Sequence, residues 1–336
     1  MGKCCLTTAG GDYTIPSKMT TGMTYRRCGR SGILLPEISL GLWHNFGGGA
    51  DEAECRAMVG KALELGVCHF DLADNYGPPP GSAEECFGRL LKRDFAAQRD
   101  EMFISTKAGH LMWPGVYGDW GSRKHLISGL NQSLRRMQLD YVDVFYHHRP
   151  DPNTPLEETI GALVDIVRSG KALYIGLSKY PPALFQQACA MLREEKVPCL
   201  LHQIRYNLLD RACEAEVLPT VAQEQTGCIV FSPLAQGMLT GKYLGGKLPS
   251  VSRAADTSSV FLNAEKVQAD AERVQQLQNI AEAAGIPLTE LALRWLLRRE
   301  EITSVLIGAR TVAQLEQCAA AAGQAPLPQD VLEAIG

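Results

Sequence analysis

Short apolar runs alternate along the chain with longer segments in which apolar residues recur at helical spacing. Apolar runs of about four to eight residues are typical of strands that are buried on both faces. They predict eight strands, at residues 38–42, 68–72, 102–106, 142–146, 172–177, 199–204, 227–231 and 304–307. The amphipathic segments predict helices at residues 51–65, 122–137, 156–167, 181–194, 218–225, 264–284, 288–299, 312–322 and 331–335.

A further helix, after the second predicted strand, has a candidate start signal. Ser82 is followed three residues later by Glu85, which is the spacing of a capping box. In a capping box, the two side chains hydrogen-bond to each other's backbone N–H groups and fix the first helical turn. We therefore expect this helix to begin with Ser82 as its cap.

The regular alternation of strand and helix predicts one (β/α)8 barrel, the TIM-barrel fold. The main alternative is an open, doubly wound sheet, but no G-x-G-x-x-G motif follows the first strand. Residues 23–27 and 33–35 flank a turn and predict an N-terminal β-hairpin that could close one end of the barrel. We expect a single domain over residues 21–336, after a disordered tail over residues 1–20. Extra helices lie near the C-terminus, after a long loop at residues 245–263.

Composition and charge exclude several classes of function. The 336 residues are 46% hydrophobic and 21% charged with a net charge of −4, which gives no indication of nucleic-acid binding. No apolar run reaches the roughly 18 residues of a membrane span, and we see no secretory signal, so we expect a cytoplasmic protein. The 11 cysteines contain no C-x-x-C pair or metal-ligand spacing. We interpret them as buried thiols in a reducing compartment.

Four reactive side chains stand at or just beyond the ends of three neighbouring predicted strands. Asp71 is near the end of the second strand with Tyr76 in the loop beyond it, Lys107 follows the third, and His148 follows the fourth. Because the carboxyl ends of barrel strands carry the active site, we expect these groups to converge. Each alone has an ordinary structural explanation, as a turn residue, loop packing, a solvated charge or a core histidine.

Together these groups are suited to protonating an oxygen atom while a hydride arrives at the carbon bonded to it. A phenol with a pKa of about 10 is a poor acid at neutral pH, and an ammonium group such as that of Lys107 favours its ionised form. Asp71 can pair with Lys107, while a neutral His148 can orient a carbonyl oxygen. His147 would point away, because successive side chains of a strand alternate in direction.

Longer motifs around these positions resemble the aldo-keto reductase superfamily. They include FDLADNYG at residues 70–77, STK at 105–107, DVFYHH at 143–148, FSPLAQG at 231–237 and LIGAR at 306–310. Residues 75–85 and 113–115 are similar to the bacterial L-glyceraldehyde 3-phosphate reductase branch, which is akin to the potassium-channel β-subunits. The similarity covers about residues 23–322, nearly the whole of the predicted domain.

The resemblance implies NADP(H)-dependent reduction of small aldehydes, such as L-glyceraldehyde 3-phosphate and methylglyoxal. Tyr76 would be the proton donor, Lys107 and Asp71 would tune it, and His148 would orient the carbonyl. An alternative is a channel-β-like regulatory module that senses the redox state of bound NADP(H). The resemblance also allows a homo-oligomer.

The resemblance further implies residues that bind NADP(H). Ser178 and Gln203 would hold the nicotinamide carboxamide, and Phe231 would stack on the nicotinamide ring. Other cofactor contacts would come from Trp43, Ser232, Pro233, Leu234, Gln236, Gly237, Lys242, Gly308, Arg310, Gln314 and Gln317. The residue types agree in part, because a glycine-containing turn with a lysine suits a pyrophosphate, and a helix N-terminus with an arginine suits a 2′-phosphate.

Three positions depart from the family's pattern. Lys179 stands where Asn or Ser is usual beside the carboxamide, and Gln317-Cys318 stands where Glu-Asn usually contacts the adenine. Arg205 could meet an anionic substrate or pair with an acid. These departures leave open an enzyme with weakened cofactor binding. The loop after the third strand carries aromatic residues that would line the substrate pocket or pack within the loop: Trp113, Tyr117 and Trp120.

Overall fold

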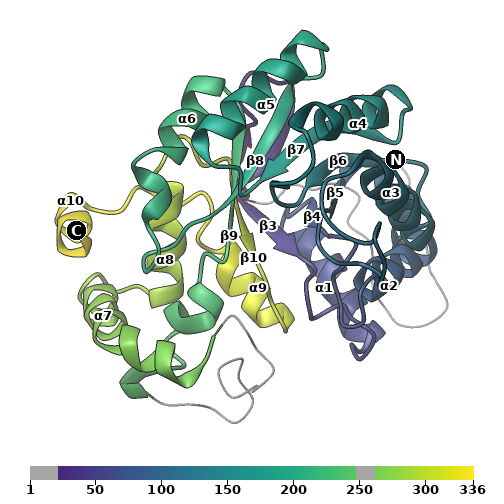
Figure 1. Cartoon of the computed structure of the whole chain (residues 1–336). Helices are drawn as coiled ribbons and strands as arrows, with labels where there is room; N and C mark the ends of the chain where they lie inside the picture. The colour runs from purple at the N-terminus through teal and green to yellow at the C-terminus, as the bar shows by residue number, and fades with distance from the viewer. Residues whose placement is uncertain (1–21, 247–261) are drawn as a thin grey trace, which may run out of the picture.

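The parallel strands form a closed barrel in the computed structural model, which describes residues 22–246 and 262–336 (Figure 1). The strand order is β10-β3-β4-β5-β6-β7-β8-β9, and neighbouring strands are parallel throughout. The strands are β3 (Ile38–Gly41), β4 (His69–Asp71), β5 (Phe103–Ala108), β6 (Val142–His147), β7 (Ala172–Ser178), β8 (Cys199–Arg205), β9 (Gly227–Phe231) and β10 (Ser304–Ile307). The predicted (β/α)8 barrel is confirmed, and the doubly wound alternative is wrong.

Helices surround the barrel, and their predicted positions are confirmed except for small differences at the ends. They are α1 (Glu52–Glu64), α2 (Ser82–Leu90), α3 (Arg123–Met137), α4 (Leu156–Arg168), α5 (Pro182–Glu194), α6 (Val217–Glu224), α7 (Ala264–Ala283), α8 (Leu288–Leu297), α9 (Val312–Ala319) and α10 (Gln329–Ile335). In Figure 1, the extra helices α7 and α10 lie on the side of the molecule opposite α2 and α3. The predicted tail and most of the predicted loop at residues 245–263 lie outside the described residues.

The N-terminal hairpin closes the amino end of the barrel, as predicted. β1 (Tyr25–Arg27) pairs antiparallel with β2 (Leu34–Pro36), which leads directly into β3. Cys28 and Leu35 pack against side chains of the barrel strands, including Tyr146. The barrel interior is therefore a packed core with a lid of two short strands, which leaves the carboxyl end for chemistry.

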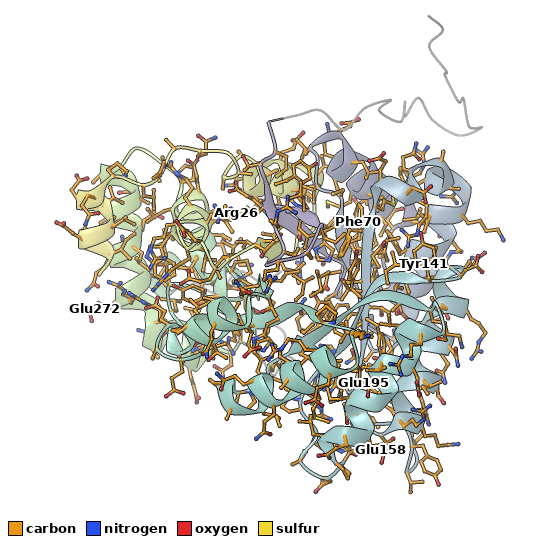
Figure 2. The ribbon with its side chains drawn as sticks, turned by 90° about the horizontal axis from the view of Figure 1, so that it is seen from above. Arg26, Phe70, Tyr141, Glu158, Glu195 and Glu272 are labelled. Atoms are coloured by element: carbon orange, nitrogen blue, oxygen red, sulfur yellow. The ribbon has the colours of Figure 1, made fainter. Side chains whose placement is uncertain are left out.

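Arg26 anchors the hairpin to the C-terminal part of the chain (Figure 2). Its guanidinium group lies 2.7 Å from the carboxylate of Glu37. It also donates hydrogen bonds of 2.7 to 3.1 Å to three backbone carbonyls, those of Leu297, Arg299 and Ile302. These bonds satisfy carbonyl groups between the end of α8 and the start of β10, where the last barrel strand enters.

Helix α2 begins differently from the prediction. Gly81, with a φ of +88°, precedes the first helical residue, and no side chain caps the helix. The Ser82 hydroxyl instead donates to the carbonyl oxygen of Pro79 at 2.6 Å. The capping box predicted from Ser82 and Glu85 is therefore wrong, because the tight turn after Tyr76 places Ser82 inside the helix with its hydroxyl directed back to that turn.

The nine cysteines of the described residues are all buried and unpaired, as the composition predicts. In residues 22–246 and 262–336, no helix has the length and apolar content needed to cross a bilayer. The same ranges contain no group of three or more His, Cys, Asp or Glu side chains placed to hold a metal ion.

Gly176 makes room for the ring of Tyr146 inside the barrel. The two residues are partners in the β6–β7 ladder, and a Cβ added to Gly176 would lie 2.2 Å from the ring. Tyr146 is fully buried, and its ring cannot withdraw from a close-packed interior. The absence of a side chain at position 176 is thus a packing requirement.

Replacing Gly176 by Ala should lower the free energy of unfolding by about 1–3 kcal/mol, the usual cost of overpacking a core. Urea denaturation measures this change. Gly161→Ala is the matched control, because Gly161 lies in α4 and an added Cβ would have no atom within 4 Å apart from its chain neighbours and the backbone of its own helix. The control should be neutral or stabilising, and wild-type stability in Gly176→Ala would contradict the tight fit.

Candidate active site

The four reactive side chains converge at the carboxyl end of the barrel. Asp71 is the last residue of β4, and His148 directly follows β6. Lys107 lies inside β5, whereas the sequence placed it just after the strand. Tyr76 reaches the same place from the loop after β4, where its carbonyl oxygen accepts a hydrogen bond from the N–H of Gly81 at 3.0 Å. That bond folds the loop back and directs the phenol toward the strand ends.

Lys107 joins these groups through its ammonium. Its Nζ donates to Asp71 Oδ2 at 2.5 Å, to the carbonyl oxygen of Leu72 at 2.6 Å and to the Tyr76 hydroxyl at 3.3 Å. The side chains of Lys107 and Asp71 are both fully buried. Burial lowers the pKa of Lys107, and attraction to Asp71 opposes this effect only in part. The ammonium group therefore touches the phenol that it would have to stabilise after proton loss.

Asp71 is held by neutral donors as well as by Lys107. Its Oδ1 accepts hydrogen bonds from Ser105 Oγ at 2.6 Å and from the side-chain amide of Gln203 at 3.2 Å. Both oxygens of the buried carboxylate therefore have partners, which is the condition for keeping a charge inside a protein.

A chain of buried hydrogen bonds continues from Ser105 across the barrel. Ser105 Oγ is 3.1 Å from His69 Nε2, and His69 Nδ1 is 2.8 Å from Ser39 Oγ. The hydroxyls of Ser39 and Ser304 are 2.5 Å apart, which links β3 to β10. Burial lowers the pKa of His69 to about 4, so the ring is neutral at pH 7. Asp71 is thus tied to the strands that close the barrel.

The phenol of Tyr76 stays protonated in this environment. Burial, followed by the nearby carboxylates Asp71 and Asp74, raises its pKa well above the ordinary value. This direction is opposite to the one expected from Lys107 alone, because burial outweighs the attraction of the ammonium group for a phenolate. The result is a protonated acid beside a cation, an arrangement that can deliver a proton to an oxygen acceptor.

His148 faces the site, whereas His147 faces away. The ring of His148 lies edge-on to that of Tyr76, with centroids 6.0 Å apart. Burial, followed by the charge of Lys107, lowers the pKa of His148 well below its usual value, so its imidazole is neutral. His147 instead makes a 2.6 Å hydrogen bond to the hydroxyl of Tyr180.

The residues expected to contact the nicotinamide lie at the ends of the neighbouring strands. Ser178 ends β7, and its hydroxyl donates to the carbonyl oxygen of Gln203 in β8 at 3.1 Å. Phe231 ends β9 and is partly exposed. Trp43 lies beyond β3, with its ring centroid 6.2 Å from that of Tyr76. The structure brings these residues around the same opening as the four reactive groups.

The turn after β9 is a candidate anion cradle. It holds positive φ angles at four positions, Ser232, Ala235, Gln236 and Gly237, and it also contains Pro233 and Leu234. The Lys242 ammonium lies over this turn, since a Cβ on Gly237 would be 2.5 Å from its Nζ. The N–H groups of Ala235 and Gly237 donate to the carbonyl oxygens of Ser232 and Leu234 within the turn, at 3.0 and 2.8 Å, so the Lys242 ammonium is the group placed to attract an anion. These residues therefore fit the pyrophosphate of the implied cofactor.

A second candidate phosphate site lies between β10 and α9. Gly308 and Arg310 are exposed there, and the N–H of Arg310 donates to Gln314 Oε1 at 2.8 Å. Gln317 is exposed on α9, whereas Cys318 is buried and cannot replace a polar contact on the surface. The guanidinium beside a helix N-terminus suits an added phosphate.

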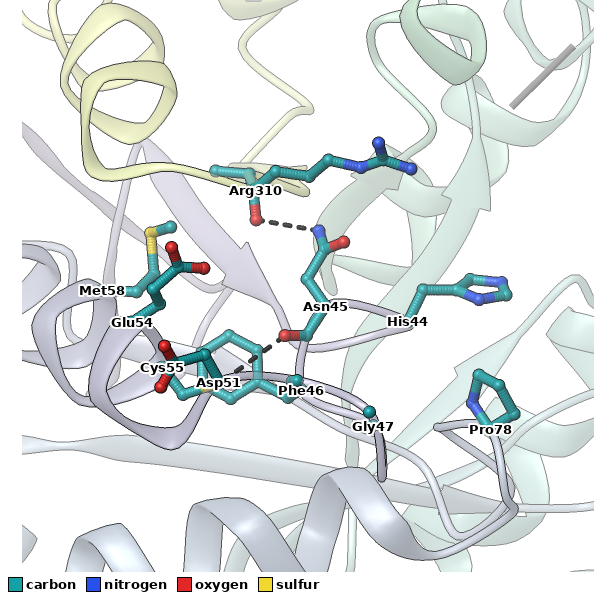
Figure 3. Close-up of a pocket in the computed structure, with 13 residues that line it drawn as sticks. His44, Asn45, Phe46, Gly47, Asp51, Glu54, Cys55, Met58, Pro78 and Arg310 are labelled. Carbon is teal, nitrogen blue, oxygen red and sulfur yellow. Dashed lines mark hydrogen bonds between the residues drawn. The ribbon is translucent and has the colours of Figure 1, made fainter. Parts of the chain in front are cut away.

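A pocket of about 560 Å³ opens beside Arg310, between the loop after β3 and the start of α1 (Figure 3). The side-chain amide of Asn45 bridges two of its walls by donating to the carbonyl oxygen of Ala309 at 2.8 Å. Asp51 and Glu54 supply carboxylates to the other side. Beyond Trp43, the sequence did not single out this loop, because its glycines and scattered polar residues carry no recognisable motif.

Two further residues at the mouth of the site were not singled out by the sequence. The ring centroid of His110 lies 4.4 Å from that of His148. The guanidinium of Arg149 stacks 3.7 Å above the ring of Trp120 and pairs with Asp119 at 2.6 Å. His110 and Arg149 each lie two residues beyond a strand end, which is the signal that could have identified them.

The other residues considered as substrate contacts have structural partners. Trp113 packs against His125, with ring centroids 5.1 Å apart, and Tyr117 is exposed on the loop after β5. Arg205 pairs with Asp210 at 3.0 Å, which is the second of the two alternatives considered for it. Of the three aromatic residues considered, Trp120 is the one that stacks on Arg149.

A barrel that gathers a phenol, a buried ammonium–carboxylate pair and a neutral imidazole at its strand ends belongs to the oxidoreductases that act on carbonyl groups. Residues 37–336 match the aldo/keto reductase family, and the chain belongs to that family. The resemblance read from the sequence is thereby confirmed.

Two kinds of relative share most of the chain. It is 53% identical over 299 residues to the L-glyceraldehyde 3-phosphate reductase of Escherichia coli (strain K12), covering 88% of this chain and 86% of that protein. It is 37% identical over 298 residues to a probable voltage-gated potassium channel subunit beta of Oryza sativa subsp. japonica, covering 87% and 89%. A protein of the same description from Arabidopsis thaliana is 35% identical over 310 residues, covering 91% and 93%. The family and the first relative support aldehyde reduction as the chemistry.

Replacing Lys107 by Met should leave the Asp71 carboxylate buried without its cation. Breaking a buried ion pair in this way costs about 3–5 kcal/mol, and urea denaturation should show a loss of that size. The double variant Lys107→Met, Asp71→Asn removes both charges and should recover part of the lost stability. Strictly additive losses in this double-mutant cycle would show that the two groups do not interact.

Proposed function

We propose that the protein reduces small aldehydes to alcohols with NADPH in the cytoplasm, and that its substrates include L-glyceraldehyde 3-phosphate and methylglyoxal. The observation that carries the proposal is the Tyr76 hydroxyl, which lies 3.3 Å from Lys107 Nζ above the buried pair with Asp71. When bound, NADPH would supply the hydride that the carbonyl carbon accepts. The relative named L-glyceraldehyde 3-phosphate reductase supports this substrate class.

The strand ends on one side of the barrel would bind the cofactor. Ser178 and Gln203 would hold the carboxamide, with Phe231 against one face of the nicotinamide ring and Trp43 near its edge. The cradle of residues 232–237 would bind the pyrophosphate together with Lys242. The exposed residues around α9 would bind the 2′-phosphate and adenosine: Gly308, Arg310, Gln314 and Gln317. Preference for NADPH over NADH would come from Arg310, whose guanidinium can donate two parallel hydrogen bonds to a phosphate.

The carbonyl oxygen of the aldehyde would lie between Tyr76 and the neutral ring of His148. The raised pKa of Tyr76 means that the phenol keeps its proton until the oxygen becomes basic. As charge develops on that oxygen, Tyr76 donates its proton and Lys107 stabilises the phenolate that is left. Asp71 keeps Lys107 in place and charged throughout.

Replacing Tyr76 by Phe removes the proton donor with little change in volume. The rate constant kcat should fall by about 100-fold or more, since general acid catalysis contributes at least that much. NADPH affinity should be nearly unchanged. The assay follows the loss of NADPH absorbance with both enantiomers of glyceraldehyde 3-phosphate, methylglyoxal and a nitrobenzaldehyde, with NADH in parallel.

Tyr180→Phe is the matched control for this variant. Tyr180 is buried and bonds to His147, which faces away from the site, so this loss of a hydroxyl should leave most of the turnover. Turnover retained in Tyr76→Phe would show that another group donates the proton.

A channel-β-like regulatory module that senses bound NADP(H) is the second candidate. The relatives described as probable potassium channel beta subunits favour it, because they match 87% and 91% of the chain, against 88% for the reductase. NADP that stays bound through purification, together with very slow turnover of every aldehyde, would support the module. Rapid turnover that requires Tyr76 would support the reductase.

A further inference from the structure

Lys179 extends from the end of β7 over the mouth of the candidate site. It follows Ser178 and adopts a φ of +61°, which is uncommon for a residue with a long side chain. Its N–H donates to the carbonyl oxygen of Gln203 at 3.0 Å, which holds this turn in place. Its Nζ lies 5.7 Å from the centre of the Phe231 ring and 3.4 Å from His110 Nε2.

A row of rings connects Lys179 to the reactive centre. The centroids of Tyr76 and His148 are 6.0 Å apart, and those of His148 and His110 are 4.4 Å apart. His110 then meets the Lys179 ammonium. A short aldehyde with its carbonyl between Tyr76 and His148 could extend along this row and bring its far end to Lys179.

Lys179 differs in its pairing from the two other cations near the reactive centre, Lys107 and Arg149. Lys107 is paired with Asp71, and Arg149 is paired with Asp119. Among residues 22–246 and 262–336, no carboxylate forms an ion pair with Lys179, whose side chain is exposed to solvent. Partial removal from water, followed by repulsion from Lys107 and Arg149, lowers the pKa of Lys179 to about 8. A bound anion would oppose both effects and would be attracted by all of these charges.

We infer that Lys179 binds the phosphate group of a phosphorylated aldehyde and thereby gives the site a preference for such substrates over neutral aldehydes. The inference rests on the proposed function, because it places the carbonyl between Tyr76 and His148. A phosphate monoester carries about −1.5 to −2 charges at pH 7 and three strong acceptor oxygens. It can therefore accept hydrogen bonds from the ammonium of Lys179 at the open end of the site.

His110 acts as a positioning residue in this arrangement. Burial, followed by the charges of Lys179 and Arg149, lowers the pKa of His110 to about 4, so its ring is neutral at pH 7. A neutral ring nitrogen accepts a hydrogen bond from the ammonium, which limits the directions that the lysine can adopt. The family resemblance predicts a neutral Asn or Ser at position 179. The positive charge of Lys179 is therefore a departure of this chain from the family's pattern.

The test compares two substrates that differ by the phosphate alone, glyceraldehyde 3-phosphate and glyceraldehyde, at saturating NADPH. In Lys179→Met, the ratio of kcat/KM for the phosphorylated over the neutral aldehyde should fall about 10- to 100-fold, the usual effect of losing a hydrogen bond to a charged group. The loss should appear chiefly in KM. Lys179→Arg keeps the charge and should restore most of the ratio.

Lys196→Met is the matched control. Lys196 is an exposed lysine with a φ of +59°, but it precedes β8 and so lies at the amino end of the barrel. The Lys196→Met variant removes the same charge from a residue with the same backbone conformation at the opposite end of the barrel. The ratio of kcat/KM for the two aldehydes should therefore not change. A fall in the control equal to that in Lys179→Met would attribute the effect to net charge and overturn the inference.

Direct binding separates failure of the inference from failure of the proposed function. Calorimetric titration of glyceraldehyde 3-phosphate into the protein saturated with NADP⁺ needs no turnover. The affinity that it measures should be lower in Lys179→Met than in the wild type. Reduction of glyceraldehyde by the wild type, with an unchanged substrate ratio in Lys179→Met, would sink the inference and leave the proposed function standing. Equal losses of kcat/KM with both aldehydes in Lys179→Met, together with weaker NADPH binding, would show that Lys179 contacts the cofactor. That result would also overturn the inference. Absence of turnover with either aldehyde would refute the proposed function, and unaltered binding in the variant would then refute the phosphate contact as well.

Discussion

The candidate site depends on the buried ion pair between Asp71 and Lys107. Taking two charges out of water costs several kcal/mol per ion, and their mutual attraction repays this only when other hydrogen bonds satisfy the remaining atoms. Ser105, Gln203 and the carbonyl of Leu72 supply those bonds. They come from β5, β8 and the segment after β4, so the pair can exist only in the closed barrel.

The same residues therefore help to close the barrel and to position the reactive groups. Hydrogen bonds through His69 and Ser39 carry the connection from Asp71's partner Ser105 to Ser304 in the last strand. The hairpin fills the opposite end with apolar side chains, which leaves polar groups for the carboxyl end. A site built on strands in this way holds its groups more rigidly than one built on loops, and the loops add further contacts, such as that of His110 with Lys179.

Much of the architecture could be predicted from the sequence because the strands and helices of a barrel are short, regular and marked by their apolar residues. Local hydrogen bonds were harder to predict. Ser82 and Glu85 have the spacing of a capping box, but the turn formed by the preceding prolines moves the start of α2 by one residue and redirects the hydroxyl. Residues at the mouth of the site, such as His110, were not predicted from the sequence because they lie in loops without a periodic pattern.

By itself, the sequence determined the fold class, the family and the meeting of Asp71, Tyr76, Lys107 and His148, because successive strand ends of a (β/α)8 barrel must lie side by side. The tertiary structure decided how these groups behave. It brought Gln203 to Asp71 from a strand 132 residues away, made burial the dominant influence on the pKa of Tyr76, and left Lys179 without a carboxylate partner in the described residues. Burial and the approach of distant strands set these properties, and neither is encoded in the local pattern of residues around each group.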